Sequence, residues 1–330
     1  KNQKNTLFGN YYTMIDSNQR SFICGIRGYK LLDSEIKFLH KYKPWGVILF
    51  SRNIKSISQS KKLTNEIRKI FKDKKYPIFI DQEGGRVNRL KSFFNTDPFT
   101  GEFFGNLYKK DIKKFNIYYN LFTRQTCDIL KLIGVNVNTV PVLDIRNSGS
   151  HNVIGDRAFS KDPKIISKIG DICIKNYHTN NIGTVIKHIP GHGLAKVDSH
   201  KFTPVIKTKL NQLKKNDFSV FKKKKSFFAM TAHIIYKDID SLNTATHSKK
   251  IIQIIRKNIK FNKILISDDI SMKGLKYSIK KNTLKAFEAG CNLVLHCNGN
   301  FKEMCIVAKN SPNLSKFIIK KTSQFYNFLR

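Results

Sequence analysis

Short apolar runs alternate with longer segments of helical periodicity along most of the chain. Residues 58–73 show this periodicity clearly, because Leu63, Ile67 and Ile70 recur on one helical face with Lys and Glu residues opposite. Residues 165–178, 249–259 and 284–290 also predict helices. The alternation is typical of parallel βα units. The runs that predict strands are residues 22–26, 45–50, 77–81, 135–144, 183–188, 227–234, 264–268 and 292–297.

The number of predicted strands favours a closed (β/α)8 barrel, the TIM barrel of the α/β class. Polar residues stand at or just beyond the C-terminal ends of these strands, where such a barrel gathers its active site. An open doubly wound sheet is the alternative fold. No Gly/Ser-rich or Pro-rich tract divides the chain, so we expect one domain over residues 1–330. The strand-end polar residues are Asp81, Asp144, Lys187, His188, His233, Asp268 and Asn298.

Residues 264–272 lead from an aliphatic strand directly into two adjacent carboxylates, Asp268 and Asp269. A carboxylate at a strand end can attack an anomeric carbon and form a covalent glycosyl-enzyme. Asp268 is the stronger candidate for this nucleophile. Asp269 is equally well explained as a cap of the following helix.

Residues 187–200 are rich in Gly, Pro and His and predict a long functional loop. Asp198 lies two residues before His200, near enough to orient the imidazole for acid/base catalysis. The glycines of this loop are candidate hinges for its closure over a substrate. Its histidines and Asp198 would alternatively suit zinc, but the Pro and Gly residues break the helix that a His-x-x-x-His pair needs. We therefore expect neither a metal nor a cofactor.

Two further loops carry arginine and glycine after predicted strands, at residues 81–89 and 153–159. Asp81 is suited to accept hydrogen bonds from sugar hydroxyls. Arg86 and Arg89 are suited either to bind a ligand or to pair with nearby acids, and a structural ion pair is the simpler interpretation of Arg86.

These four segments, in this order and at these separations, resemble family 3 glycoside hydrolases, most closely the single-domain bacterial β-N-acetylglucosaminidases of peptidoglycan recycling. The resemblance covers nearly the whole chain. Two departures stand out, since Asp156 replaces a usual Glu and Asn292 replaces a usual Asp.

The resemblance implies a retaining reaction in which Asp268 is the nucleophile, His200 is the acid/base and Asp198 orients His200. It also implies an exo-hydrolase that removes terminal β-linked N-acetylglucosamine (GlcNAc) from GlcNAc-1,6-anhydroMurNAc muropeptides. A phosphorylase that uses phosphate as acceptor and a β-glucosidase are alternatives within the family. The substrate-binding residues implied are Asp81, Arg89, Arg157, Lys187 and His188.

The chain is strongly basic, with 61 Lys and Arg residues, 23 Asp and Glu residues and a net charge of +38. A basic nucleic-acid-binding protein on a barrel scaffold is therefore the alternative from another class. However, the lysines occur in short runs along the whole sequence and arginine is scarce, which favours dispersed surface charge and no nucleic-acid partner. The six cysteines contain no C-x-x-C pair, so neither a zinc knuckle nor a disulfide framework is indicated.

No apolar run approaches the roughly 20 residues of a membrane span, and residues 1–6 are polar and are not followed by an export signal. We therefore expect a cytoplasmic protein with a small carbohydrate or muropeptide substrate and no membrane partner. The sequence does not fix the oligomeric state, for which a monomer is favoured.

Overall fold

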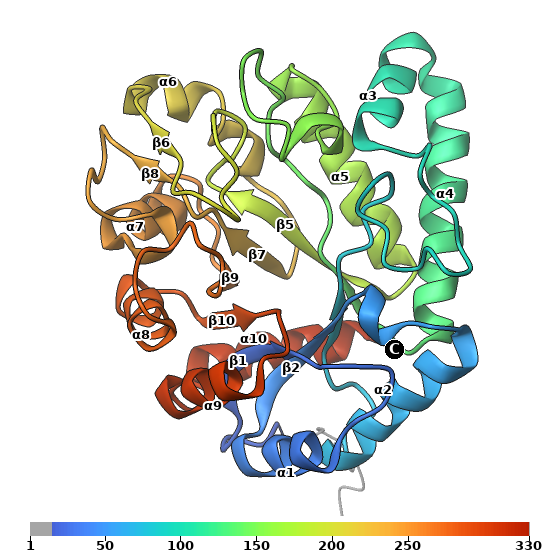
Figure 1. Ribbon diagram of the computed structural model, residues 1–330. Coiled ribbons are helices and arrows are strands. Elements are labelled where there is room, and N and C mark those ends of the chain that lie inside the picture. The colour runs from blue at the N-terminus through green and yellow to red at the C-terminus, as the bar shows by residue number, and fades with distance from the viewer. Residues whose placement is uncertain (1–14, 330) are drawn as a thin grey trace, which may run out of the picture.

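The fold is that of a closed barrel of parallel strands, seen in a computed structural model that describes residues 15–329 (Figure 1). Within these residues, eight strands close in the order β1-β10-β9-β7-β5-β4-β3-β2, and all neighbouring pairs are parallel. The predicted barrel is confirmed and the open sheet is excluded. Residues 1–6, on which the expectation about an export signal rests, lie outside the described range. The strands are β1 (Arg20–Gly25), β2 (Pro44–Leu49), β3 (Ile78–Ile80), β4 (Val137–Asn138), β5 (Gly183–Ile189), β7 (Phe228–Thr231), β9 (Ile264–Asp269) and β10 (Leu293–His296).

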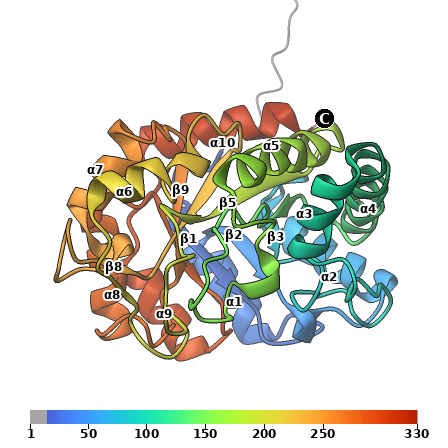
Figure 2. The ribbon, with the colours of Figure 1, turned by 90° about the horizontal axis from the view of Figure 1, so that it is seen from above.

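Helices surround the barrel (Figure 2), and the four predicted helices correspond to α2, α5, α7 and α8. Ser56, Asp162 and Ser248 cap the first turns of α2, α5 and α7 by accepting hydrogen bonds from backbone N–H groups. Outside the barrel, β6 (Val205–Ile206) pairs with β8 (Ile235–Tyr236). The α-helices are α1 (Asp33–Tyr42), α2 (Ile57–Phe71), α3 (Gly101–Lys110), α4 (Ile112–Leu132), α5 (Pro163–Thr179), α6 (Leu210–Lys215), α7 (Lys249–Lys257), α8 (Ile279–Ala289), α9 (Phe301–Asn310) and α10 (Lys316–Phe328).

Among the helices of residues 15–329, none combines the length and the apolar character needed to cross a membrane. The sequence analysis predicted one domain over residues 1–330, and we keep this single-domain organisation as a proposal.

The predicted strand 135–144 is the largest disagreement with the sequence analysis, because only β4 (Val137–Asn138) is regular strand. Pro141 has no N–H group and cannot continue the ladder of hydrogen bonds. A bridge between Val142 and Lys187 resumes the pairing beyond it. Asp144, at the end of these irregular residues, accepts hydrogen bonds from the N–H groups of His188 in β5 and of His192 just after it.

Apolar side chains fill the barrel and close its N-terminal end. Trp45, Phe79 and Phe228 contact one another inside it, with ring centroids 5.6 to 5.8 Å apart. Helix α10 packs across this end: Phe325 meets Phe228 edge to face at 5.1 Å, and the Trp45 indole N–H donates to Thr322 Oγ1 at 2.9 Å. The opposite, C-terminal end is therefore the end that is open for chemistry.

Replacing Phe325 by Ala tests the packing of α10. The side chain is fully buried, so we expect the free energy of unfolding to fall by about 3–5 kcal/mol. The same replacement at Phe202, which is 63% exposed, should change it by less than about 0.5 kcal/mol. Equilibrium denaturation of both variants measures this difference, and equal stabilities would contradict the packing described.

Candidate active site

A cavity of about 460 Å³ opens at the C-terminal ends of the barrel strands. Its walls include all eight residues that the sequence analysis proposed as catalytic or substrate-binding, which come from four separate segments of the chain. The fold thus brings the predicted residues together, while their individual roles stay predictions. The eight are Asp81, Arg89, Arg157, Lys187, His188, Asp198, His200 and Asp268.

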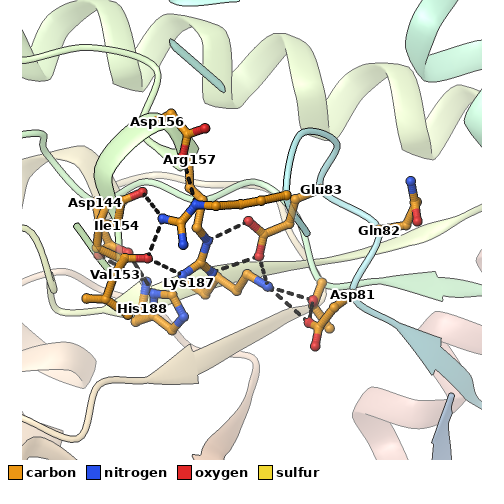
Figure 3. A network of polar contacts seen from close by, with 12 residues as sticks. Asp81, Gln82, Glu83, Asp144, Val153, Ile154, Asp156, Arg157, Lys187 and His188 are labelled. Atoms are coloured by element: carbon orange, nitrogen blue, oxygen red, sulfur yellow. Dashed lines mark hydrogen bonds and ion pairs between the residues drawn. The ribbon is translucent and has the colours of Figure 1, made fainter. Parts of the chain in front are cut away.

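A network of alternating charges forms one wall of the cavity (Figure 3). The Lys187 ammonium, at the end of β5, lies 3.0 Å from Asp81 Oδ1 and 2.6 Å from Glu83 Oε1. Arg157 donates to both carboxylate oxygens of Glu83 at 2.8 Å, the strong bidentate arrangement. Arg89 reaches Asp81 Oδ2 at 3.4 Å. Each buried cation therefore has a carboxylate partner, which burial of charge requires.

The pKa values of the two carboxyl groups follow from this network. Burial raises the pKa of Glu83, but Arg157 and Lys187 lower it by more, to about 2. Burial likewise raises the pKa of Asp81, and Lys187 and Arg89 reverse the effect and hold it well below its usual range. Both groups are therefore carboxylates at neutral pH.

Glu83 is the functional candidate that the sequence analysis missed. It joins the two predicted binding cations Lys187 and Arg157, and its side chain is only 6% exposed. A signal was present, because Glu83 lies two residues after Asp81 at a strand end, and residues two apart in extended chain point to the same side.

His188 is fixed by Asp144, a fully buried carboxylate that lies behind the cavity wall. Asp144 Oδ2 lies 2.6 Å from His188 Nδ1, and Oδ1 accepts the backbone N–H of His192 at 2.7 Å. Burial raises the pKa of Asp144, but His188 outweighs that effect and lowers it. The carboxylate thus orients the His188 ring and anchors the start of the loop that leads to His200.

Asp268 is near the end of β9 and faces the cavity. Burial raises the pKa of this carboxyl, but His233, His188 and the Asp269 N–H group lower it by more. The group is therefore ionised, as a nucleophile must be. Asp269 instead accepts hydrogen bonds from the Ser271 N–H and hydroxyl groups and from the Cys297 N–H group. The helix cap that was its alternative interpretation is wrong, because Ser278 caps the following helix, α8.

His200 and Asp198 form a hydrogen-bonded pair on the same cavity. Asp198 Oδ1 lies 2.8 Å from His200 Nδ1 and also accepts the His200 backbone N–H at 2.9 Å. The pair makes Nδ1 the protonated nitrogen and leaves Nε2 for proton exchange. Burial raises the pKa of Asp198, and the bonds from His200 lower it by more, so that Asp198 stays anionic. The His200 side chain is 61% exposed and can therefore exchange protons with water.

Other residues highlighted by the sequence have structural contacts. Arg86 pairs with Asp156 at 2.9 Å and donates to the carbonyls of residues 152–154, so the ion pair expected for Arg86 is present. Asp156 thus holds Arg86, whereas Glu83 holds Arg157. Asn292 accepts a hydrogen bond from the Leu265 N–H group at the start of β9.

Three of the strand-end polar residues do not line the cavity. Asp144 lies behind it, and Asn298 donates to Glu303. His233 is fully buried between Thr246 and the Asp269 carbonyl.

Within residues 15–329, no group of three or more His, Cys, Asp and Glu side chains is arranged to hold a metal ion.

Comparison with known proteins agrees with this geometry. Residues 19–321 match the profile described as the Glycosyl hydrolase family 3 N terminal domain. A protein named beta-hexosaminidase from Idiomarina loihiensis is 32% identical over 277 residues, covering 83% of this chain and 82% of its own. Another of that name from Neisseria meningitidis serogroup C is 31% identical over 279 residues, covering 83% and 76%.

A solved structure extends the likeness to three dimensions. NagZ from Neisseria gonorrhoeae in complex with N-trifluoroacetyl-D-glucosamine aligns with a TM-score of 0.83 at 27% identity, covering 93% of this chain and 90% of that one. Since the family profile matches most of the chain and a relative above 30% identity is covered over most of its length, the chain belongs to glycoside hydrolase family 3 and is a glycoside hydrolase.

Proposed function

We propose that the protein is a retaining exo-β-N-acetylglucosaminidase that removes terminal β-linked GlcNAc. The observation that carries this proposal is that an ionised strand-end carboxylate, Asp268, and an imidazole–carboxylate pair, His200 with Asp198, line the same cavity. Relatives named beta-hexosaminidase, and a similar structure bound to an N-acylated glucosamine, support this class of sugar.

The reaction has two displacement steps. In the first, Asp268 attacks the anomeric carbon and forms a glycosyl ester, while His200 Nε2 gives its proton to the departing oxygen. In the second, His200 Nε2 takes a proton from water, the water oxygen attacks the anomeric carbon, and Asp268 leaves as a carboxylate. Asp198 stabilises the imidazolium that gives its proton in the first step and is regenerated in the second.

The charged network is suited to hold the sugar in the −1 subsite. Asp81 accepts hydrogen bonds from sugar hydroxyl groups, while Arg89, Arg157, Lys187 and His188 donate hydrogen bonds to hydroxyl oxygens and to the N-acetyl group. The cavity volume of about 460 Å³ lies within the roughly 300–1,000 Å³ of small-molecule sites. We further propose that the leaving part is a muropeptide, as in GlcNAc-1,6-anhydroMurNAc, and that the enzyme acts in peptidoglycan recycling in the cytoplasm.

Replacing Asp268 by Asn tests the nucleophile. Because Asn has nearly the same shape but is a far weaker nucleophile, we expect kcat on an aryl N-acetyl-β-glucosaminide to fall by at least about 10³-fold. Steady-state hydrolysis with the purified variant measures this. Turnover near the wild-type rate would eliminate the mechanism.

Replacing Glu83 by Gln tests the network that joins Lys187 and Arg157. The amide keeps the shape but removes the charge that holds both cations, so we expect kcat/KM to fall by about tenfold to a hundredfold. Asp156→Asn is the matched control, because it changes a carboxylate in an arginine pair that is partly exposed, whereas Glu83 is buried. A control variant as impaired as Glu83→Gln would contradict the special role of Glu83.

Two substrate comparisons separate the proposed activity from its alternatives within the family. We expect the 4-nitrophenyl N-acetyl-β-glucosaminide to be preferred over the plain glucoside by at least about 10²-fold in kcat/KM, because the subsite binds the N-acetyl group. Added phosphate should leave free sugar as the product. A preference for the glucoside would favour a β-glucosidase, and formation of sugar 1-phosphate would favour a phosphorylase.

A further inference from the structure

The two reactive groups lie on segments that the barrel does not pair directly. Asp268 belongs to β9, whereas His200 lies in the long segment that follows β5. In the barrel, β7 separates these two strands. Hydrogen bonds of the sheet therefore do not fix the position of His200 relative to Asp268, and contacts outside the sheet must do so.

Three hydrogen bonds join the segment of His200 to the chain just beyond β9. The Lys273 N–H group donates to the His200 carbonyl at 3.2 Å, and the Gly274 N–H group donates to the Ser199 carbonyl at 3.0 Å. In the other direction, the Thr203 hydroxyl donates to the Gly274 carbonyl at 2.6 Å. We call these contacts between residues 199–203 and residues 273–274 the clasp.

The close approach in the clasp depends on Gly274. A Cβ atom at this position would overlap the Ser199 carbonyl oxygen and would lie 3.1 Å from the Phe202 carbonyl oxygen. Both obstacles are backbone atoms, so no side-chain rotation can relieve the overlap. The φ angle of Gly274 lies outside the left-handed range, so the need for glycine is one of space and not of backbone conformation.

Ser199 is also held from the opposite side of its loop. Its hydroxyl lies 2.9 Å from His192 Nε2, and the His192 N–H group is itself bound by Asp144. Because Ser199 stands between Asp198 and His200, the proposed acid/base pair flanks a residue that is anchored both to the base of its loop and to the segment after β9.

From these contacts we propose that the clasp sets the position of His200 relative to Asp268, with Gly274 and Thr203 as its positioning residues. The proposal rests on the proposed roles of Asp268 and His200. Neither Gly274 nor Thr203 lines the cavity, so both act through His200 and not on the substrate. Loosening the clasp should therefore weaken protonation of the leaving group specifically.

Leaving-group dependence distinguishes this loss from general damage. A dinitrophenolate leaves without a proton, whereas an aliphatic alcohol needs one, and kcat/KM reports the step in which the leaving group departs. We compare kcat/KM on the dinitrophenyl and the aliphatic N-acetyl-β-glucosaminides for the wild type and for five variants. They are Gly274→Ala, Thr203→Val, Thr203→Ser, His200→Ala as reference and Gly28→Ala as control.

We expect His200→Ala to lower kcat/KM by about 10²-fold or more on the aliphatic substrate and far less on the dinitrophenyl one. Gly274→Ala should lower kcat/KM on the aliphatic substrate by about tenfold or more, again with a much smaller loss on the dinitrophenyl substrate. Thr203→Val should show the same selectivity with a smaller loss. Thr203→Ser keeps the hydroxyl and should restore most of the wild-type value. Gly28→Ala should match the wild type, because a Cβ atom there meets nothing within 4 Å.

The outcomes separate the clasp from the mechanism on which it rests. If His200→Ala lowers kcat/KM by the same factor on both substrates, the proposed acid/base role of His200 fails. Suppose instead that His200→Ala lowers kcat/KM mainly on the aliphatic substrate. The clasp proposal is then overturned if the clasp variants lower kcat/KM equally on both substrates, or leave it unchanged on both. If Gly274→Ala does not fold, Thr203→Val and Thr203→Ser test the clasp proposal by the same comparison of kcat/KM on the two substrates.

Discussion

Closure of the parallel sheet is the constraint on which the site depends. A closed barrel places the C-terminal ends of its strands in a ring, so that side chains as distant in sequence as Asp81 and Asp268 line the same cavity. The opposite end is filled by aromatic side chains and covered by α10. The apolar end thus supports a polar end whose side chains come from the ends of the strands and from the loops that follow them.

Charge balance is the second requirement of this site. Lys187 is nearly fully buried, and such a cation is costly unless it is paired and hydrogen-bonded. Asp81 and Glu83 supply that pairing, and Glu83 shares its charge with Arg157. This wall of the cavity is therefore a preorganised set of donors and acceptors, as the proposed binding of a sugar with little reorganisation requires.

The fold and the core of the site could be predicted because their signals are local. Aliphatic runs that end in Asp81, Lys187 or Asp268 identify both the strands and the residues at their ends. The spacing of Asp198 and His200 likewise predicts a pair that needs only two residues of chain to form.

Other features could not be predicted, because they depend on contacts between distant segments. The bond between Glu83 and Arg157 spans 74 residues, and no periodicity reports it. The shortened β4 shows that a single Pro141 outweighs an apolar run that otherwise indicates a long strand. The bonds of Ser199 and His200 to residues 273–274 are made by backbone groups, which every residue carries, so the sequence alone does not reveal them.

The most direct test of the account is to trap the covalent intermediate with a fluorinated N-acetylglucosaminyl fluoride and to locate the label by peptide mass spectrometry. The account predicts one sugar bound to the peptide that contains Asp268, and no label in the Asp268→Asn variant. Attachment to another residue, or release of product with inverted anomeric configuration and no bound sugar, would contradict it.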